Sequence, residues 1–392
     1  MENVGVNLKL VSFAIIYFMT LLQFGTDLYL PSFPDISSAL DTSDAYVQIS
    51  LSLFLFGFAI SQLIYGPLSD RFGRKLFIVG GMLLFLLSSL MCAFSQNILW
   101  LLIGRLLQGL GAGSASVISR AMMKDCFSGK DLEKLAAMQA VIWSFVPMIA
   151  PVLGSYVQAY LGWRSNFYLL SVFASLAVMV AVSLPETNQN KQLSISFVKV
   201  FNNYKKIITN LKFVAYALCP MCIVAMNMSF NTVAPFLFQQ GYGLTVVSYG
   251  WIILIIAVSF LIGTVINRSL LSRISSTQLI KIGVCIVIST SALLFVITIL
   301  DSRPNLILVI VMLIFTWIGT SLVYSNCAAQ IMHIFPELAG SSAALFGCMV
   351  FIGGMTGSAV IAHLPNTDLW GFSSLVLLYA VIMLIFGRVA QK

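Results

Sequence analysis

Charge is scarce in this sequence. Asp, Glu, Lys and Arg make up only 9% of the 392 residues, whereas 59% are hydrophobic. Soluble globular proteins carry about 25% charged residues. A water-soluble fold could not bury so much apolar surface, so we infer that the chain is solvated by lipid.

Histidine is nearly absent, and the seven cysteines follow no ligand pattern. His333 and His363 are far apart, and most cysteines lie in apolar segments. Cys219 and Cys222 have the spacing of a redox motif, but without a βαβ context we expect them to be packing residues. We predict no metal site, no disulfide framework and no cofactor other than protons as a coupling ion. Because an enzyme would need clustered His, Cys or acidic residues at a membrane surface, we predict that the chain is not an enzyme.

Long apolar runs recur along the whole chain. A spanning helix needs about 20 mainly apolar residues, and such runs lie at about 10–30, 45–65, 76–94, 98–119, 136–160, 163–184, 213–238, 246–267, 277–299, 305–325, 341–362 and 371–388. Alternating ten-residue patterns are missing, so we predict an all-α integral membrane protein with twelve transmembrane helices. The first run is too long for a signal peptide and lacks a cleavage site before Asp27, so we count it as a span.

The basic residues predict the orientation. With both termini in the cytoplasm, only Arg164 and Arg303 fall outside the cell, which is a strong positive-inside signal. The remaining basic positions lie inside, at Lys9, Arg71, Arg74, Lys75, Arg120 to Lys134, Lys191 to Lys212, Arg268, Arg273, Lys281, Arg388 and Lys392. The net charge of +8 therefore fits anionic lipid at the inner leaflet, and we predict no nucleic-acid partner.

The longest polar stretch, Pro185 to Lys212, divides the spans six and six. We predict an N-terminal six-helix bundle over 1–187, a cytoplasmic loop over 188–212 and a C-terminal six-helix bundle over 213–392. Two pseudo-symmetric halves are typical of a transporter whose substrate site lies between them near the midplane. A single bundle with one long loop is the alternative.

Polar residues form a stripe in the first span. Tyr17, Thr20, Gln23 and Asp27 follow spacings of three, three and four residues, which places them on one side of a helix. A carboxylate facing lipid costs at least about 3 kcal/mol. We therefore expect the stripe to face a polar cavity.

The fourth span contains Arg105 and Gln108 among glycines that let helices approach closely. Arg105 is the only basic residue well within a predicted span, and Asp27 is the only acid available to it. Both should lie within about 5–10 Å of the outer boundary, with side chains leaning toward each other. Asp27 could carry protons as the cavity changes, or it could be a fixed salt-bridge partner.

The turn between spans two and three reads GPLSDRFGRK. Glycine suits a tight turn on the cytoplasmic side because it adopts backbone angles that other residues avoid. An acidic residue can interact with a helix N-terminus, and the basic residues are expected to lie in the cytoplasm. We expect these roles for Gly66, Asp70, Arg71, Gly73, Arg74 and Lys75. Together with Arg105, Gln108 and Gly109, this loop resembles the signature of the major facilitator superfamily.

Further motifs narrow the resemblance to the Bcr/CflA branch of multidrug:proton antiporters. They are TDLYLPSFP (Thr26 to Pro34), GWRSNF (Gly162 to Phe167), LPET (Leu184 to Thr187) and AGSSAALFG (Ala339 to Gly347). The resemblance implies that Asp27 takes part in proton coupling and that Arg105 tunes it. It also implies that Asp70 closes an inner gate against the eleventh helix, for which Gly340, Ser341, Ser342 and the basic Arg120 are plausible partners.

Two regions depart from the family pattern. The fifth helix reads SFVPMIAPVLGS, which keeps a hinge at Pro147, Pro151 and Gly154 but lacks other glycines of the antiporter motif. The C-terminal copy of the gating loop, NRSLLSRISS, lacks the aspartate and the glycines. No acid lies deep in spans seven to twelve, so proton handling is expected in the N-terminal half.

We predict a monomeric proton-coupled transporter in the inner membrane that exports drugs or other amphipathic small molecules by alternating access. Asn227 and Asn231, together with Tyr17, Thr20, Gln23 and Gln108, are expected to line an apolar cavity with a few polar groups. The alternative keeps the fold but carries one dedicated solute, such as a siderophore or sugar, in either direction. A sensor or a membrane enzyme is a different class, and neither an extra soluble domain nor clustered catalytic residues support it.

Overall fold

The computed structural model describes residues 8–188, 197–301, 303–365 and 369–389. In this part of the chain, twelve helices are long and apolar enough to cross a membrane. The first combines α1 (Leu8–Asp27), η1 (Leu30–Ser32) and α2 (Phe33–Ala39), and the others contain α3 (Asp44–Phe72), α4 (Arg74–Ala93), α5 (Ile98–Cys126), α6 (Gly129–Leu161), α7 (Arg164–Ser183), α9 (Leu211–Phe236), α10 (Val246–Leu270), α11 (Ser276–Leu300), α12 (Leu306–Ile334), α13 (Ala339–Ile361) and α14 (Trp370–Val389). The ends of the two predicted bundles, part of the central loop, Lys191 and Lys392 lie outside the described residues.

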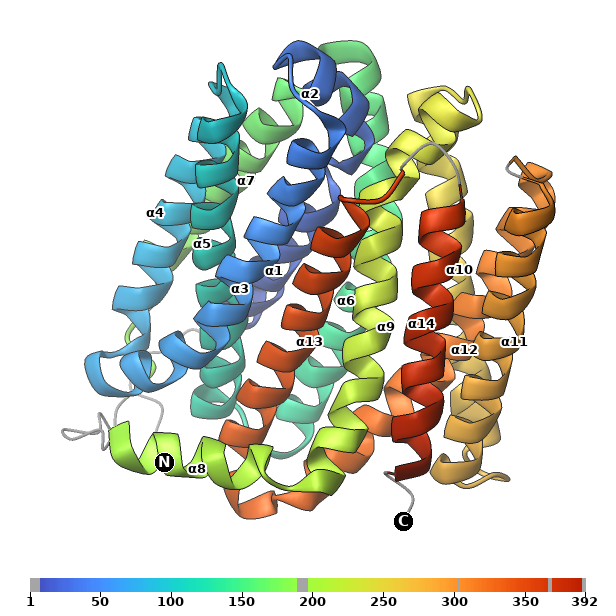
Figure 1. Cartoon of the computed structure of the whole chain (residues 1–392). Helices are drawn as coiled ribbons and strands as arrows, with labels where there is room; N and C mark the ends of the chain where they lie inside the picture. The colour runs from blue at the N-terminus through green and yellow to red at the C-terminus, as the bar shows by residue number, and fades with distance from the viewer. Residues whose placement is uncertain (1–7, 189–196, 302, 366–368, 390–392) are drawn as a thin grey trace.

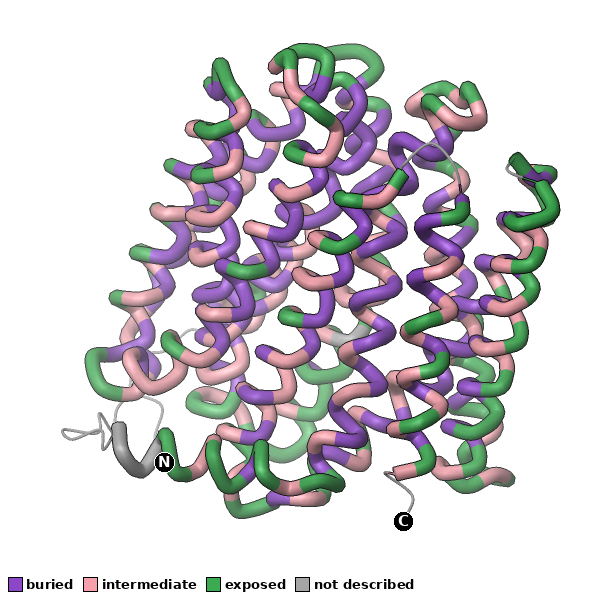
Figure 2. Tube along the Cα trace, in the orientation of Figure 1, coloured by how far each residue is buried: buried purple, intermediate pink, exposed green. Residues whose placement is uncertain are grey.

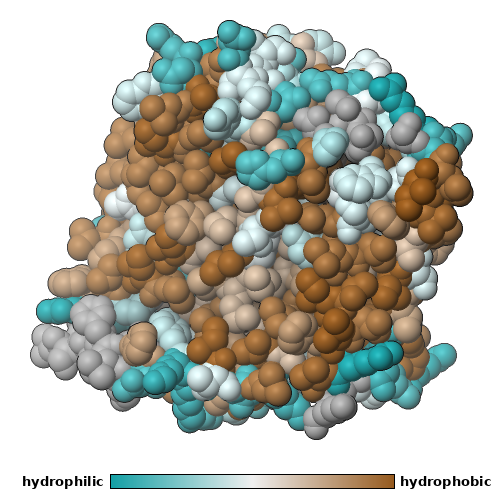
Figure 3. All heavy atoms as spheres, viewed as in Figure 1, coloured by the Kyte–Doolittle hydropathy of each residue, from teal (hydrophilic) through white to brown (hydrophobic). Residues whose placement is uncertain are grey.

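The long helices run side by side between two faces of the molecule (Figure 1). We call the end at which α1 begins and α14 ends the terminal face, and the opposite end, where α2 lies, the far face. The short helix α8 (Phe197–Ile208) lies along the terminal face. Hydrophobic residues gather around the middle of the visible surface, and hydrophilic residues gather at its two ends (Figure 3). This distribution fits a bundle surrounded by lipid.

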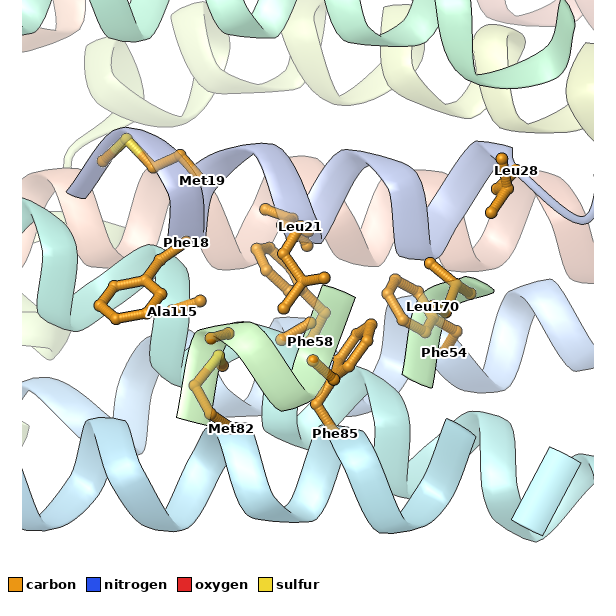
Figure 4. Close-up of a cluster of buried hydrophobic side chains, with 14 of the residues drawn as sticks. Phe18, Met19, Leu21, Leu28, Phe54, Phe58, Met82, Phe85, Ala115 and Leu170 are labelled. Atoms are coloured by element: carbon orange, nitrogen blue, oxygen red, sulfur yellow. The ribbon is translucent and has the colours of Figure 1, made fainter. Parts of the chain in front are cut away.

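The buried hydrophobic side chains form two cores. One combines residues between Val11 and Leu184 with Phe236, and the other runs from Ile207 to Met383. The cores separate between α7 and α9, where the sequence predicts the boundary between the halves. Buried residues lie along the helix faces that meet inside each half (Figure 2). Part of the first core is shown in Figure 4, in which the rings of Phe54 and Phe85 lie near Leu170.

Some helices extend well beyond the apolar runs that predict them. The described α5 continues to Cys126 and α12 to Ile334, past the predicted ends at residues 119 and 325. Hydropathy detects only the apolar stretch, whereas a helix can continue through polar residues until its end is capped. Arg120 therefore lies inside α5, beyond the apolar run that predicts the fourth span.

The first span is broken after Asp27. The helix α1 ends there, and the chain continues through η1, which contains Pro31, into α2 as far as Ala39. The predicted depth of Asp27, within about 5–10 Å of the outer boundary, treated Leu30 as the end of the span. The apolar span therefore continues past Asp27 through η1 and α2 to Ala39.

Close glycine packing joins α3 to α5. A Cβ on Gly109 would lie 2.0 Å from the carbonyl oxygen of Phe54, and one on Gly57 would lie 2.4 Å from that of Leu106. Only glycine allows such an approach. Gly73 has a φ of 105° in the turn between α3 and α4, as its predicted role requires. Gly66 lies inside α3 instead, so its predicted role in the turn is wrong.

Candidate functional site: a cavity between the two halves

A cavity of about 560 Å³ lies between the two halves. Its wall contains residues of α1, α3, α5 and α6 from one half and of α9, α10, α12 and α13 from the other. On α6 it extends from Ala136 to Pro151, which is about 22 Å along the helix axis. This volume falls in the range of small-molecule sites, about 300–1,000 Å³.

Of the residues predicted for the substrate cavity or for proton coupling, the structure brings four to this wall, Gln23, Asp27, Asn227 and Asn231. The Asn231 amide nitrogen lies 3.5 Å from Asn227 Oδ1, so the two amides share one face of α9. Polar side chains that were not predicted also line the cavity, at Gln139, Ser144, Thr264, Thr320, Tyr324 and Ser325. Their surroundings in sequence are apolar, and they carry no pattern that predicts a site.

Three other predicted cavity residues do not line it. The Tyr17 hydroxyl donates to the Phe173 carbonyl at 2.8 Å, and Thr20 Oγ1 donates to the Ile16 carbonyl at 2.9 Å. Gln108 is fully buried, and its Nε2 donates to Ser89 Oγ at 2.6 Å. At about 100° per residue, Tyr17 points about 80° away from Asp27, so the stripe turns from the cavity toward α7.

Asp27 occupies the wall near the break in the first span. Its side chain is only 4% exposed, and its Oδ1 has no hydrogen-bond partner among the described residues. Asp27 is therefore a buried carboxyl with unused acceptor capacity, at a point where the halves meet.

Arg105 lies nearby with other partners. Its Nη1 donates to the Gly25 carbonyl at 3.0 Å and to Gln108 Oε1. The guanidinium carbon is 4.0 Å from the ring centroid of Tyr29 and 4.4 Å from that of Phe54. The side chain is fully buried between these rings, which is a favourable place for a desolvated guanidinium.

The expected salt bridge between Asp27 and Arg105 is absent from the ion pairs of the described residues. Arg105 still acts electrostatically on the Asp27 carboxyl. Two aromatic rings, the Gly25 carbonyl and the Gln108 amide oxygen contact its guanidinium instead, and its Nε and Nη2 have no hydrogen-bond partner among the described residues. The fixed salt bridge is therefore not the arrangement seen in this conformation.

A second charged cluster lies at the terminal face. Arg74 forms ion pairs with Asp70 at 2.5 Å and with Asp125 of α5 at 2.9 Å. Glu186 accepts hydrogen bonds from the backbone N–H groups of Arg74 at 2.8 Å and Lys75 at 3.3 Å. It thereby caps the N-terminus of α4, where a carboxylate is favoured.

This cluster differs from the predicted gate. Asp70 is 44% exposed and pairs with Arg74, whereas its described hydrogen bonds and ion pairs include neither Arg120 nor the start of α13. Arg71 lies over the ring of Phe72, 4.9 Å from its centroid. Asp125 and Glu186 were missed because the first lies beyond the apolar run and the second was noted only within LPET. An acid at a helix end near three basic residues is the signal that could have found Asp125.

The predicted hinge residues belong to one continuous helix. Pro147 and Pro151 lie inside α6 and line the cavity. Each proline removes a helical hydrogen bond, which weakens the helix locally. Gly154 packs against the end of α1, since a Cβ there would lie 1.8 Å from the Leu28 carbonyl oxygen.

Hydrogen bonds between the halves lie on the far-face side of the cavity. The Gln239 amide donates to the Pro31 carbonyl at 2.9 Å, and Trp251 Nε1 donates to Tyr156 Oη at 3.3 Å. Deeper in the bundle, Ser52 Oγ donates to Ser358 Oγ at 2.9 Å. These contacts close the bundle between the cavity and the far face.

Twelve apolar helices in two halves around a shared cavity define a secondary transporter. The chain belongs to the major facilitator superfamily, whose family model matches residues 13–358. Within it, the chain resembles the Bcr/CflA branch. It is a multi-pass membrane transport protein and not an enzyme.

Individual relatives agree with this assignment. The chain is 31% identical to an uncharacterized MFS-type transporter, YdgK, of Bacillus subtilis (strain 168), over 86% of this chain and 84% of the relative. It is 26% identical to a bicyclomycin resistance protein homolog of Haemophilus influenzae, over 88% and 87% of the two chains. The crystal structure of a D-xylose–proton symporter shares the fold, with a TM-score of 0.72, 18% identity and coverage of 96% and 97%.

Proposed function

We propose that this protein is a proton-coupled exporter of amphipathic small molecules in the bacterial inner membrane. The observation that carries the proposal is the Asp27 carboxyl, buried in the wall of a cavity shared by both halves and lacking an ion-pair partner among the described residues. The distribution of basic residues supports cytoplasmic termini, which makes the terminal face the inner one. We propose a monomer in the lipid bilayer, because each chain contains both halves of its cavity.

The proposed cycle uses one site for two ligands. With the cavity empty, Asp27 holds a proton, which removes the cost of an uncompensated buried charge. A substrate that brings positive charge or hydrogen-bond donors to Oδ1 favours the carboxylate, and the proton leaves. Asp27 is the only acid among the described cavity residues, so substrate and proton compete for it. Such competition produces exchange when the cavity opens to alternate sides.

The cavity wall supports an amphipathic substrate. Aromatic and aliphatic side chains dominate it, including Trp143, Phe230, Phe260, Trp317 and Phe351, with amides and hydroxyls at intervals. Apolar surface with few polar groups tolerates different molecules, because burial is not directional. The relative named as a bicyclomycin resistance protein homolog supports the export of toxic compounds.

A dedicated solute carrier is the second candidate, in either transport direction. The amides of Gln23, Gln139, Asn227 and Asn231 in the wall favour it, since paired donors and acceptors suit a siderophore or sugar. Export of several unrelated amphipathic compounds by one preparation would favour the first proposal. Transport restricted to one polar solute would favour the second.

The test is substrate-induced proton release from the purified protein, with rhodamine 123 and bicyclomycin as separate probes. We expect release from wild type and none from Asp27→Asn, at equal amounts of folded protein. Asp301→Asn is the matched control, because Asp301 is exposed at the end of α11, and it should release protons like wild type. Probe binding without release by wild type would overturn the proton coupling.

A further inference from the structure

The two ends of the cavity differ in their unused hydrogen-bonding groups. Asp27 presents an acceptor without a donor at the end nearer the far face. At the other end, Arg120 of α5 lines both the main cavity and a smaller one of about 170 Å³ that continues toward the terminal face. Arg120 therefore lies where the two spaces meet.

Arg120 has a surplus of donors. Its Nε donates to the Ser116 carbonyl at 3.2 Å, and its Nη2 donates to Gln62 Oε1 and to Ser116 Oγ. No acceptor among the described residues bonds to its Nη1, and no described acid forms an ion pair with it. A partly buried guanidinium that lines a cavity and has no counter-ion is poised to bind an anion.

Neighbouring groups add to this surplus. Because a guanidinium can only donate, Gln62 turns its oxygen toward Arg120 and leaves its Nε2 without an acceptor. Trp143 Nε1, which only donates, is also buried without a partner in the described structure. Gln62 itself is only 2% exposed. All three side chains line the smaller cavity, and Arg120 and Trp143 also line the main one, so their unused N–H groups surround the place where the two spaces meet.

We propose that Arg120, Gln62 and Trp143 form a subsite for an anionic group of the transported molecule, specifically a carboxylate. This inference rests on the proposed function and narrows its substrates to amphipathic compounds that include zwitterions. A zwitterion would place its cationic or donor group near Asp27 and its carboxylate near Arg120. The predicted gating role of Arg120, by contrast, involves no contact with substrate.

A matched pair of probes separates these roles. Rhodamine 110 has a free carboxylate, and rhodamine 123 is its methyl ester, so they differ mainly in the group that Arg120 would bind. Binding of each is measured by fluorescence polarisation to the full chain in lipid nanodiscs. We expect Arg120→Gln to lower the affinity for rhodamine 110 by at least about tenfold, because it removes hydrogen bonds to a charged group. Rhodamine 123 should change by less than about twofold.

Further variants guard against misfolding. Arg120→Lys keeps the charge and should retain part of the affinity for rhodamine 110. Trp143→Phe keeps the ring and removes one donor, and should weaken rhodamine 110 selectively and by less than Arg120→Gln does. Arg268→Gln, at an exposed arginine of α10, should leave both affinities unchanged.

Several results would overturn the subsite. If Arg120→Gln lowers the affinities for both probes equally, Arg120 has a role in gating or folding and not in binding the carboxylate. If the affinity for rhodamine 110 is unchanged, Arg120 is not part of the subsite. Wild type that binds rhodamine 123 with proton release, but does not bind rhodamine 110, would overturn the subsite and leave the proposed export intact. If neither probe binds and no proton is released, both proposals fail.

Discussion

The two halves of the molecule handle polarity in different ways. In the N-terminal half, Asp27, Arg74 and Arg105 are all buried charged residues, each less than 10% exposed. In the described part of α9 to α14 and their connecting turns, every charged side chain is exposed. Buried polar contacts there join neutral groups, such as Asn267 with Asn326 and Thr298 with Ser373.

This difference indicates a division of labour. Burying a charge in the membrane costs much free energy unless partners of suitable geometry surround it. Hydroxyl and amide groups that hydrogen-bond to each other can be buried at a much lower cost. The N-terminal half therefore has the groups that can respond to protons and charged ligands. The C-terminal half completes the cavity with rings, hydroxyls and amides. Three substitutions, each with a partner or control, would break or sharpen this comparison.

The largest effect is expected at Arg105. Lysine cannot lie flat between Tyr29 and Phe54 while donating to Gly25 and Gln108, because it lacks the planar fork of guanidinium. We expect Arg105→Lys to reduce substrate-driven proton movement in membrane vesicles by at least about tenfold, which is about 1.4 kcal/mol.

Arg164→Lys is the matched control for this prediction. Arg164 also lies over a ring, 4.1 Å from the centroid of Trp163, and donates to the Ser95 carbonyl at 2.9 Å, but it is near the far face. Its substitution should change proton movement by less than about twofold, because solvent can replace these contacts. Equal losses in the two variants would show that burial of Arg105 is not the reason for its importance.

The Arg105 site also shows how far the sequence could predict the structure. Hydropathy located all twelve spans, because membrane helices must be long and apolar. Asp27 and Arg105 could be selected because charges are rare in such spans. The aromatic rings around Arg105 could not be predicted from the sequence. Tyr29 reaches Arg105 only because of the turn that follows Asp27, and no periodicity in the sequence encodes that turn.

Residues beyond the apolar runs were the hardest to assign. Arg120 and Asp125 follow the predicted end of the fourth span, so they were interpreted as a gate partner and as part of a basic surface segment. The structure places Arg120 on the cavity wall and Asp125 beside Arg74. The length of a helix beyond its apolar part depends on caps and tertiary contacts, which a hydropathy profile does not contain.

An intermediate effect is expected at Arg74. Its ion pairs with Asp70 and Asp125 join α3, α4 and α5, and its guanidinium also donates to Ser69 Oγ at 2.7 Å. We expect Arg74→Gln to lower the free energy of unfolding in mixed micelles by about 1–2 kcal/mol, after allowance for the exposure of Asp70.

A comparable arginine in the other half is Arg273, which lies in the turn between α10 and α11 and is exposed in the degenerate copy of the loop. We expect Arg273→Gln to change the free energy of unfolding by less than about 0.5 kcal/mol. A similar loss at both positions would contradict the claim that only the N-terminal loop holds a stabilising charge cluster.

The smallest effect is expected within the C-terminal half, at the buried amide pair. Asn326 Nδ2 donates to Asn267 Oδ1 at 2.6 Å and to the Leu322 carbonyl at 2.8 Å. Interhelical hydrogen bonds in membranes are worth about 0.6 kcal/mol on average, because the separated helices also find partners. A double-mutant cycle of Asn267→Ala and Asn326→Ala should therefore give a coupling free energy of about 0.6 kcal/mol.

Proton-coupled transport should persist in both variants, since a neutral pair outside the cavity wall has no charge to exchange. A coupling above about 2 kcal/mol, or loss of transport, would mean that the C-terminal half also depends on a specific polar network, and the contrast between the halves would fail.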